Sequence, residues 1–340
     1  MFLYSYKPLF LAVLMISSFI TVSANTWLGV WMGLEINLLS FIPLMKENNN
    51  LMSSESSLKY FLAQALASSV LLFSIVVTYL QKSDPLSLFS TPHVMVTSAL
   101  LLKSGMAPFH SWFPVVVEGL SWVNVMILIT WQKLAPLMVV SYLCSTKFIM
   151  VCIILSAFVG SLGGLNQVSL RKLIAYSSIN HLGWIILSMS ASEGLWLNYF
   201  VLYCFLSVSV ILIFYFMNMF FISQLFSSLF HSLGMKISLF TNILSLGGLP
   251  PFLGFYPKWM VIQIISLKSQ LFMISLMVMF SLITLFFYLR LSYSAFTMGY
   301  LETNWTMKCS MSEFKSKLVF FMSFVSFTGF LMITVFFMLY

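Results

Sequence analysis

Three lysines and one glutamate lie inside apolar stretches that are long enough to cross a bilayer. They are Glu35, Lys103, Lys133 and Lys258. An ionisable side chain at the centre of a membrane helix costs roughly 2.5 to 3.5 kcal/mol on insertion scales, so four of them cost on the order of 10 kcal/mol. Charged groups in such positions usually line a path for ions or protons. The sequence therefore predicts that these four residues form a proton or ion path.

The composition predicts the elements that must hold these charges. Of the 340 residues, 61% are hydrophobic and only 7% are charged, which is typical of a polytopic membrane protein. A spanning helix needs about 20 mostly apolar residues, and by this criterion we expect an all-α fold of about eleven transmembrane helices. The predicted spans are 3–24, 26–45, 60–80, 92–117, 121–143, 148–168, 172–191, 195–222, 237–266, 270–294 and 318–339.

A seven-residue motif occurs twice, as PFHSWFP from Pro108 and as PFLGFYP from Pro251, at a constant offset of 143. Each copy lies inside an over-long apolar segment, the fourth and the ninth. Proline removes a backbone donor and clashes with the preceding turn, so each copy should break its helix. Paired broken helices in corresponding positions of two halves mark the path in inverted-repeat transporters.

The positions of the two breaks predict one membrane domain, 1–340, built from two repeats. The first repeat would cover about 1–143 and the second about 148–294, each with five helices, and the helix at about 318–339 would be an addition. Because five is odd, the second repeat would be inverted relative to the first in the membrane.

The basic residues predict the orientation. When loops are assigned alternately to the two sides, ten of the 16 basic residues lie on the side of the N-terminus, three lie on the other side and three lie inside the spans. The N-terminus should then face the compartment of synthesis, and the C-terminus the opposite side. The net charge of +8 is thus explained by topology and by contact with lipids, and nucleic-acid binding is not expected.

Each candidate site residue also has a purely structural interpretation. Lys258 could extend to the membrane interface, and Glu35 could form a structural ion pair with a lysine. His181, in the motif SSINHLGW, could belong to a water chain on a polar stripe or be a buried histidine with ordinary partners. His110, at the first break, could simply bond carbonyl groups that the break sets free.

No redox centre is expected in this chain. The cysteines form no C-x-x-C pair and have no histidine nearby, so neither a zinc site nor an iron–sulfur cluster is predicted. The glycine-rich segment VGSLGGLNQ does not match a phosphate loop or a dinucleotide fingerprint, and its glycines suit close helix contact. The four cysteines are Cys144, Cys152, Cys204 and Cys309.

Several motifs together resemble a known family. The stretches WMGLEINLLSFIPL, LKYFLAQALAS, LLLKSGMAPFHSWFP, WQKLAPL, RKLIAYSSINHLGW and LSLGGLPPFLGFYPKW are similar to mitochondrially encoded NADH:ubiquinone oxidoreductase chain 2 (NADH dehydrogenase subunit 2), in its arthropod-like form. The resemblance extends over nearly the whole chain. It implies an antiporter-like subunit of the proton-pumping membrane arm of respiratory complex I, in the mitochondrial inner membrane, whose first repeat is truncated at the N-terminus relative to bacterial relatives.

The resemblance also implies roles and partners. Glu35 matches the family's membrane glutamate, Lys103 the lysine of the first broken helix, Lys133 the bridging lysine and Lys258 the lysine on the exit side. The other membrane-arm and accessory subunits, and lipids such as cardiolipin, would be its partners, and flavin and iron–sulfur clusters would belong to partner subunits. Many relatives have a glutamate where this chain has Val115, which leaves the role of that position open.

Two alternatives to a pumping subunit remain at this point. A stand-alone cation/proton antiporter would have the same broken helices and lysines but would work alone. A non-pumping structural subunit would keep its helices and tolerate neutral residues at the four charged positions.

Overall fold

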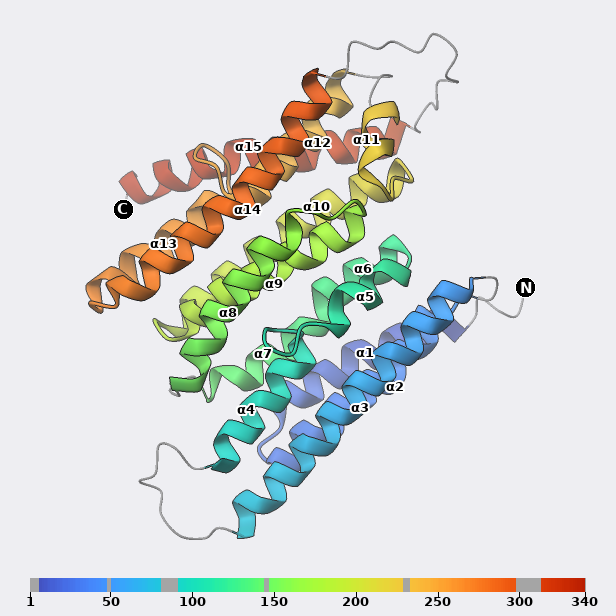
Figure 1. The fold of residues 1–340 in the computed structure, drawn as a ribbon, viewed down its shortest axis with the longest axis vertical. Coiled ribbons are helices and arrows are strands. Elements are labelled where there is room, and N and C mark those ends of the chain that lie inside the picture. The colour runs from blue at the N-terminus through green and yellow to red at the C-terminus, as the bar shows by residue number, and fades with distance from the viewer. Residues whose placement is uncertain are drawn as a thin grey trace. The chain divides into compact units, whose positions relative to one another are not determined.

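The computed structural model describes residues 6–47, 50–80, 91–143, 147–228, 233–297 and 313–339, and within these it is helical, with one isolated β-bridge between Ser169 and Phe221. The chain divides into two compact units, Met1–Ser156 and Ala157–Tyr340. We describe each unit separately. The order of the helices along the chain is shown in Figure 1.

The first unit contains α1 to α7 and the beginning of α8. α2 packs against α1 and α3, and α3 packs against α4 and α5. α7 contacts α1, α2 and α4, so the helices that carry the predicted charged residues of this unit are neighbours. The bounds are α1 Tyr6–Ser23, α2 Trp27–Met45, α3 Leu51–Leu80, α4 Thr91–Ser104, α5 Trp112–Gly119, α6 Trp122–Ile129, α7 Trp131–Ser141 and α8 Lys147–Gly164.

The second unit contains the end of α8 and α9 to α15. α10 packs against α9, α12 and α15, and α14 contacts α9, α12 and α13. Gly160 and Gly163 in α8 allow a close approach to α9, because a Cβ atom at either position would lie within 3 Å of Asn180 or Tyr176. The bounds are α9 Leu170–Met189, α10 Glu193–Phe216, α11 Ile222–Ser228, α12 Leu233–Gly247, α13 Phe255–Leu267, α14 Leu271–Thr297 and α15 Glu313–Leu339.

The two expected helix breaks are present, and the helix ends on either side of them match at the same offset of 143. α4 ends at Ser104 and α5 begins at Trp112; α12 ends at Gly247 and α13 begins at Phe255. Each first helix ends in a glycine with positive φ, 75° at Gly105 and 83° at Gly248. In each break the amide of the following residue bonds back five residues, which is the Schellman arrangement. A left-handed glycine therefore ends each helix before its proline motif begins.

The fifth span, predicted as one helix, is interrupted. α6 ends at Ile129 and α7 begins at Trp131, and Thr130 between them has distorted torsion angles, φ −103° and ψ −73°. Pro136 inside α7 lacks the N–H that would bond to Gln132. The interruption lies one turn before Lys133, so this lysine stands in the first turn of a new helix.

Two further predictions on helix bounds were wrong. α3 begins at Leu51, because the Asn50 side chain accepts from the amide of Met52 and supplies an N-cap for a polar first turn. The eighth span ends at Phe216, because Asn218 adopts φ 51° and closes the helix.

Eight helices or joined helices within the described ranges are long and apolar enough to cross a membrane. Every predicted span coincides with a helix or with a consecutive pair. The fourth and ninth spans do not meet the length criterion because they are broken, and the seventh is α9, which carries the polar SSINH segment. The prediction of about eleven helices thus exceeds the eight that qualify by length and hydropathy alone.

Candidate functional site

Two of the predicted lysines line one polar cavity in the first unit. Lys103, in the last turn of α4, is 6% exposed, and Lys133, in the first turn of α7, is 2% exposed. The cavity measures about 20 Å³, which is enough for about one water molecule. Its other polar walls come from Asn37, Tyr60, Gln64, Ser104, Trp112 and Gln132.

The ammonium group of Lys133 lies over an aromatic ring. Its Nζ atom is 4.7 Å from the centroid of Phe113 in α5, a distance at which the ring's negative face attracts a cation. Phe113 is itself buried, so the attraction acts in a desolvated setting. The first turn of α5, after the α4–α5 break, thereby contacts the lysine of α7.

Glu35, in α2, is the carboxylate that acts on Lys103. The two charges interact electrostatically, but they form no ion pair within 4.0 Å. Within the described part of the chain, neither Glu35 Oε2 nor Lys103 Nζ has a hydrogen-bond partner. The carboxylate and the ammonium are therefore coupled through space without being locked together.

Neutral side chains hold the backbone at the end of α4. Gln64 Nε2, from α3, donates to the carbonyl oxygen of Lys103 at 3.1 Å. Trp112 Nε1, from α5, donates to the carbonyl oxygen of Leu102 at 3.2 Å. Both carbonyls belong to the last turn of the helix, and that of Leu102 also accepts from the amide of Gly105 at 3.2 Å. These two bonds satisfy the broken end of α4 without using the Lys103 ammonium group.

In the second unit, a charged side chain donates to the carbonyl end of the broken helix. Lys258, in the first turn of α13, is 6% exposed, and its Nζ donates to the carbonyl oxygen of Gly247 at 2.8 Å. Gly247 is the last residue of α12. The lysine thus caps the carbonyl end of the broken helix with a positive charge, which the helix dipole favours. This bond is made inside the protein, whereas the alternative interpretation placed the ammonium at a membrane interface.

His181 belongs to a cluster of aromatic hydroxyl groups in the second unit. Its Nδ1 lies 3.1 Å from the hydroxyl of Tyr199, and its ring is 5.1 Å from that of Tyr203. Both tyrosines come from α10 and are buried. Ser177 and Ser178, one turn before the histidine on α9, are also buried. The polar stripe expected on α9 is therefore present and is extended by tyrosines from another helix.

The structure brings together three of the five predicted path residues and places the other two in the second unit. Glu35, Lys103 and Lys133 share one neighbourhood, and His181 and Lys258 lie in α9 and α13. Sequence reasoning missed the positioning residues, chiefly Gln64, Trp112, Tyr199 and Tyr203. Gln64 carried a usable signal, since it is an amide inside the apolar run LKYFLAQALAS. The tyrosines carried none, because aromatic residues are common throughout this chain.

The described residues contain no cluster of three or more histidine, cysteine or acidic side chains that could hold a metal ion. Cys152 and Cys204 form no disulfide among the described residues, and Cys144 and Cys309 lie outside them. His110 Nδ1 lies 3.2 Å from the carbonyl oxygen of Pro108, in agreement with its expected contact to a carbonyl freed by the break.

Two family models together match residues 24–338 of the chain. Residues 24–284 match the membrane family described as NADH:quinone oxidoreductase/Mrp antiporter, and residues 285–338 match NADH dehydrogenase subunit 2 C-terminus. The chain is 52% identical over 328 residues to NADH-ubiquinone oxidoreductase chain 2 of Anopheles gambiae, which covers 96% of both chains. It belongs to the NADH-ubiquinone oxidoreductase chain 2 family. The resemblance read from the motifs is confirmed.

Other members of the chain 2 family and more distant structures agree with this assignment. The protein of Locusta migratoria is 44% identical over 310 residues, covering 91% of each chain. A chain of respiratory complex I from Thermus thermophilus has the same fold, with a TM-score of 0.83 at 21% identity, covering 96% of this chain and 78% of that one. A chain of the Mrp complex from Dietzia gives a TM-score of 0.76 at 14% identity, covering 97% and 75%. This chain 2 protein is therefore a multi-pass membrane protein with the antiporter-like fold.

Proposed function

We propose that this chain is a core membrane-arm subunit of NADH:ubiquinone oxidoreductase and contributes to proton translocation coupled to electron transfer from NADH to ubiquinone. Its relatives bear the name of that enzyme, and its fold is that of the antiporter-like subunits. The observation that carries the proposal is the pair of buried lysines on one polar cavity, with a carboxylate acting on one of them.

The proposed path uses five residues. Glu35 and Lys103 act as the gate, Lys133 and His181 as the relay, and Lys258 stands near the exit. Whether a buried lysine keeps its proton depends on its desolvation and on neighbouring charges, so a change at one member alters the proton affinity of the next. Because Glu35 and Lys103 are coupled but not in direct contact, a small movement could strengthen or weaken their interaction.

The energy required is compatible with such a mechanism. Moving one proton against 100 mV costs about 2.3 kcal/mol. Two unit charges a few ångströms apart interact by about 4 kcal/mol at an effective dielectric constant near 20. Forming or losing one charge interaction in this setting is thus of the right size to drive a proton step.

The location and the partners follow from the same proposal. The chain would lie in the mitochondrial inner membrane, with its N-terminus on the matrix side and its C-terminus on the intermembrane-space side, as the ten-to-three distribution of basic residues favours. The other complex I subunits would be its partners and would hold the flavin and the iron–sulfur clusters, and inner-membrane lipids would surround it. The matching breaks support two inverted repeats, about 1–143 and 148–294, followed by the helix at about 318–339.

The proposal is tested by Lys103→Ala in the assembled complex, with proton translocation and NADH:quinone turnover measured together. Lys59→Ala, at an exposed lysine of α3, is the control, and blue-native gels confirm assembly. We expect coupled turnover and pumping to fall by at least about tenfold in Lys103→Ala and to be unchanged in the control, since Lys103, unlike Lys59, is buried at the cavity. Parental pumping by an assembled Lys103→Ala complex would support the non-pumping structural subunit instead.

A second candidate function is a stand-alone cation/proton antiporter. The fold match to the Mrp complex favours it, since the same broken helices and lysines would serve both activities. Reconstitution of the chain alone into vesicles separates the two functions. Cation-driven proton movement by the isolated chain would support the antiporter, and its absence there combined with pumping by the complete complex would support the subunit.

A further inference from the structure

A second cavity lies in the second unit, beside the broken helix. It measures about 170 Å³ and is bounded by α9, α12, α13 and α14 and by the segment between α12 and α13. Its walls are almost entirely apolar, and Val278 and Leu282 contribute to them from α14. A dry apolar cavity of about 150 Å³ is known to hold a ring the size of benzene. This cavity is therefore large enough for an organic group.

The polar groups that face this cavity include two that can only donate hydrogen bonds. Lys258 supplies an ammonium group, of which one bond goes to Gly247 and two N–H groups remain. Trp184, on α9, also lines the cavity, and its indole carries a single N–H donor. Its side chain is 1% exposed, and its Nε1 has no hydrogen-bond partner among the residues that the structure describes. A buried donor without an acceptor costs about 1 to 3 kcal/mol, so an acceptor that enters the cavity would relieve this cost.

The chemistry of the walls selects the ligand. Two donor-only groups, one of them charged, are best matched by a group that only accepts and carries a negative charge. The cavity volume is about five to six times the 30 Å³ that a water molecule occupies in the liquid. It therefore accommodates a carboxylate with several methylene groups. A glycerophospholipid head with two chains would not fit this space. Leu282 is 54% exposed, so an alkyl chain can leave the cavity along α14 towards the surface.

We propose that this cavity binds the carboxylate end of a fatty acid from the surrounding membrane. The carboxylate accepts hydrogen bonds from Trp184 Nε1 and Lys258 Nζ, and the first methylene groups fill the space between α13 and α14, which pack against each other in the second unit (Figure 1). No covalent step is involved. Binding would place a negative charge directly beside Lys258.

The test is photolabelling of the assembled complex with a ten-carbon fatty acid that carries a diazirine on its chain. We expect saturable labelling that maps to α13 and α14. Unlabelled decanoate should compete, and its methyl ester should compete roughly tenfold less well, because a hydrogen bond to a charged group is lost. Equal competition by the ester would overturn the carboxylate assignment. Equal competition by a short-chain phosphatidic acid would overturn the fatty-acid assignment.

Matched variants test the location. Trp184→Phe keeps an aromatic side chain, although a smaller one, and removes the donor, so the fatty-acid concentration for half-saturation should rise roughly tenfold. Val278→Trp fills the cavity and should abolish labelling, whereas Met279→Trp, at the neighbouring residue that is 63% exposed, should not. Assembly of each variant is confirmed by blue-native gels. Unchanged labelling in Val278→Trp would overturn the proposal, and the comparison of acid with ester in the unmodified complex tests it without any substitution.

Discussion

Replacing Gly248 by alanine should disconnect Lys258 from the end of α12. Gly248 has φ 83°, and a left-handed conformation costs a residue with a side chain about 1 to 2 kcal/mol. The new Cβ would lie 2.9 Å from Lys258 Nζ and 3.1 Å from its Cδ. The lysine is the part that can move, and moving it breaks its 2.8 Å bond to Gly247. A hydrogen bond to a charged group contributes about 1.5 to 3 kcal/mol.

The two costs together amount to about 3 kcal/mol, so the population with an intact break should fall roughly hundredfold. We would measure proton translocation, NADH:quinone turnover and the temperature at which the assembled complex loses activity. Gly247→Ala is the control, because its Cβ would meet only the ring of Tyr288 at 3.3 Å. Gly248→Asn separates the causes, since asparagine tolerates positive φ but still displaces Lys258. Equal behaviour of Gly248→Ala and Gly247→Ala would refute the reasoning.

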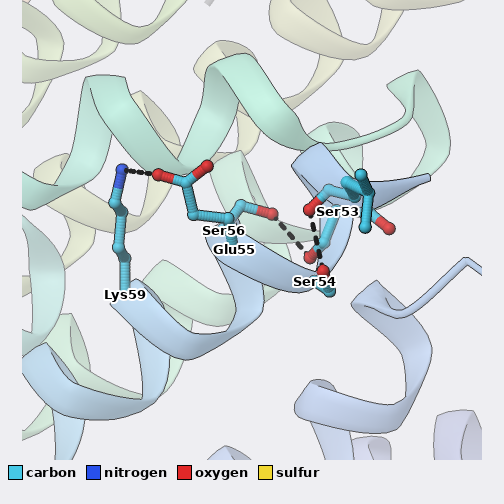
Figure 2. Close-up of polar contacts among 6 residues, drawn as sticks. Ser53, Ser54, Glu55, Ser56 and Lys59 are labelled. Carbon is cyan, nitrogen blue, oxygen red and sulfur yellow. Dashed lines mark hydrogen bonds and ion pairs between the residues drawn. The ribbon is translucent and has the colours of Figure 1, made fainter.

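Three smaller changes test the remaining contacts, with activity loss on heating as the measure of stability. Gln64→Leu leaves the carbonyl of Lys103 without its 3.1 Å donor and should destabilise the complex by about 1 to 3 kcal/mol; heat resistance equal to the parent would contradict this role. Tyr199→Phe removes the hydroxyl that lies 3.1 Å from His181, so the pH profile of proton translocation should change, and an unchanged profile would exclude His181 from the path. Glu55→Gln breaks an exposed ion pair (Figure 2) and should change stability by less than about 1 kcal/mol, which makes it the control for both.

The helix breaks could be predicted from the sequence because proline acts locally. Pro108 and Pro251 occur in matched motifs at one offset, and each follows a helix that ends at a left-handed glycine. The interruption at Thr130 was missed, although Pro136 inside the same apolar run was a usable signal. One proline in a long apolar run does not show on which side of it the helix will be interrupted. The position depends on which neighbouring helices can supply partners for the backbone groups that lose their intrahelical hydrogen bonds.

The candidate site could be predicted in its charges but not in its contacts. A charged side chain inside an apolar span costs free energy. The positions of Glu35, Lys103 and Lys133 in such spans therefore marked them as candidate site residues. Their convergence on one neighbourhood depends on which faces of α2, α4 and α7 meet, and a chain that is apolar on nearly all faces gives no strong periodic signal for that. The hydroxyl groups around His181 were hidden for the same reason.

The two breaks lie at matching positions, but different side chains donate to the last carbonyl groups of the broken helices. This difference decides which lysine substitution gives the result that is easier to interpret. At the first break neutral donors from Gln64 and Trp112 satisfy the last turn, and the Lys103 ammonium takes no part. At the second break the Lys258 ammonium is itself the cap. Neutralising Lys258 therefore removes a charge and a structural bond together, whereas neutralising Lys103 removes a charge and leaves the backbone bonds of its helix in place. A loss of pumping in Lys103→Ala can thus be assigned to the missing charge, because the hydrogen bonds that hold the broken end of α4 do not involve the side chain that is removed.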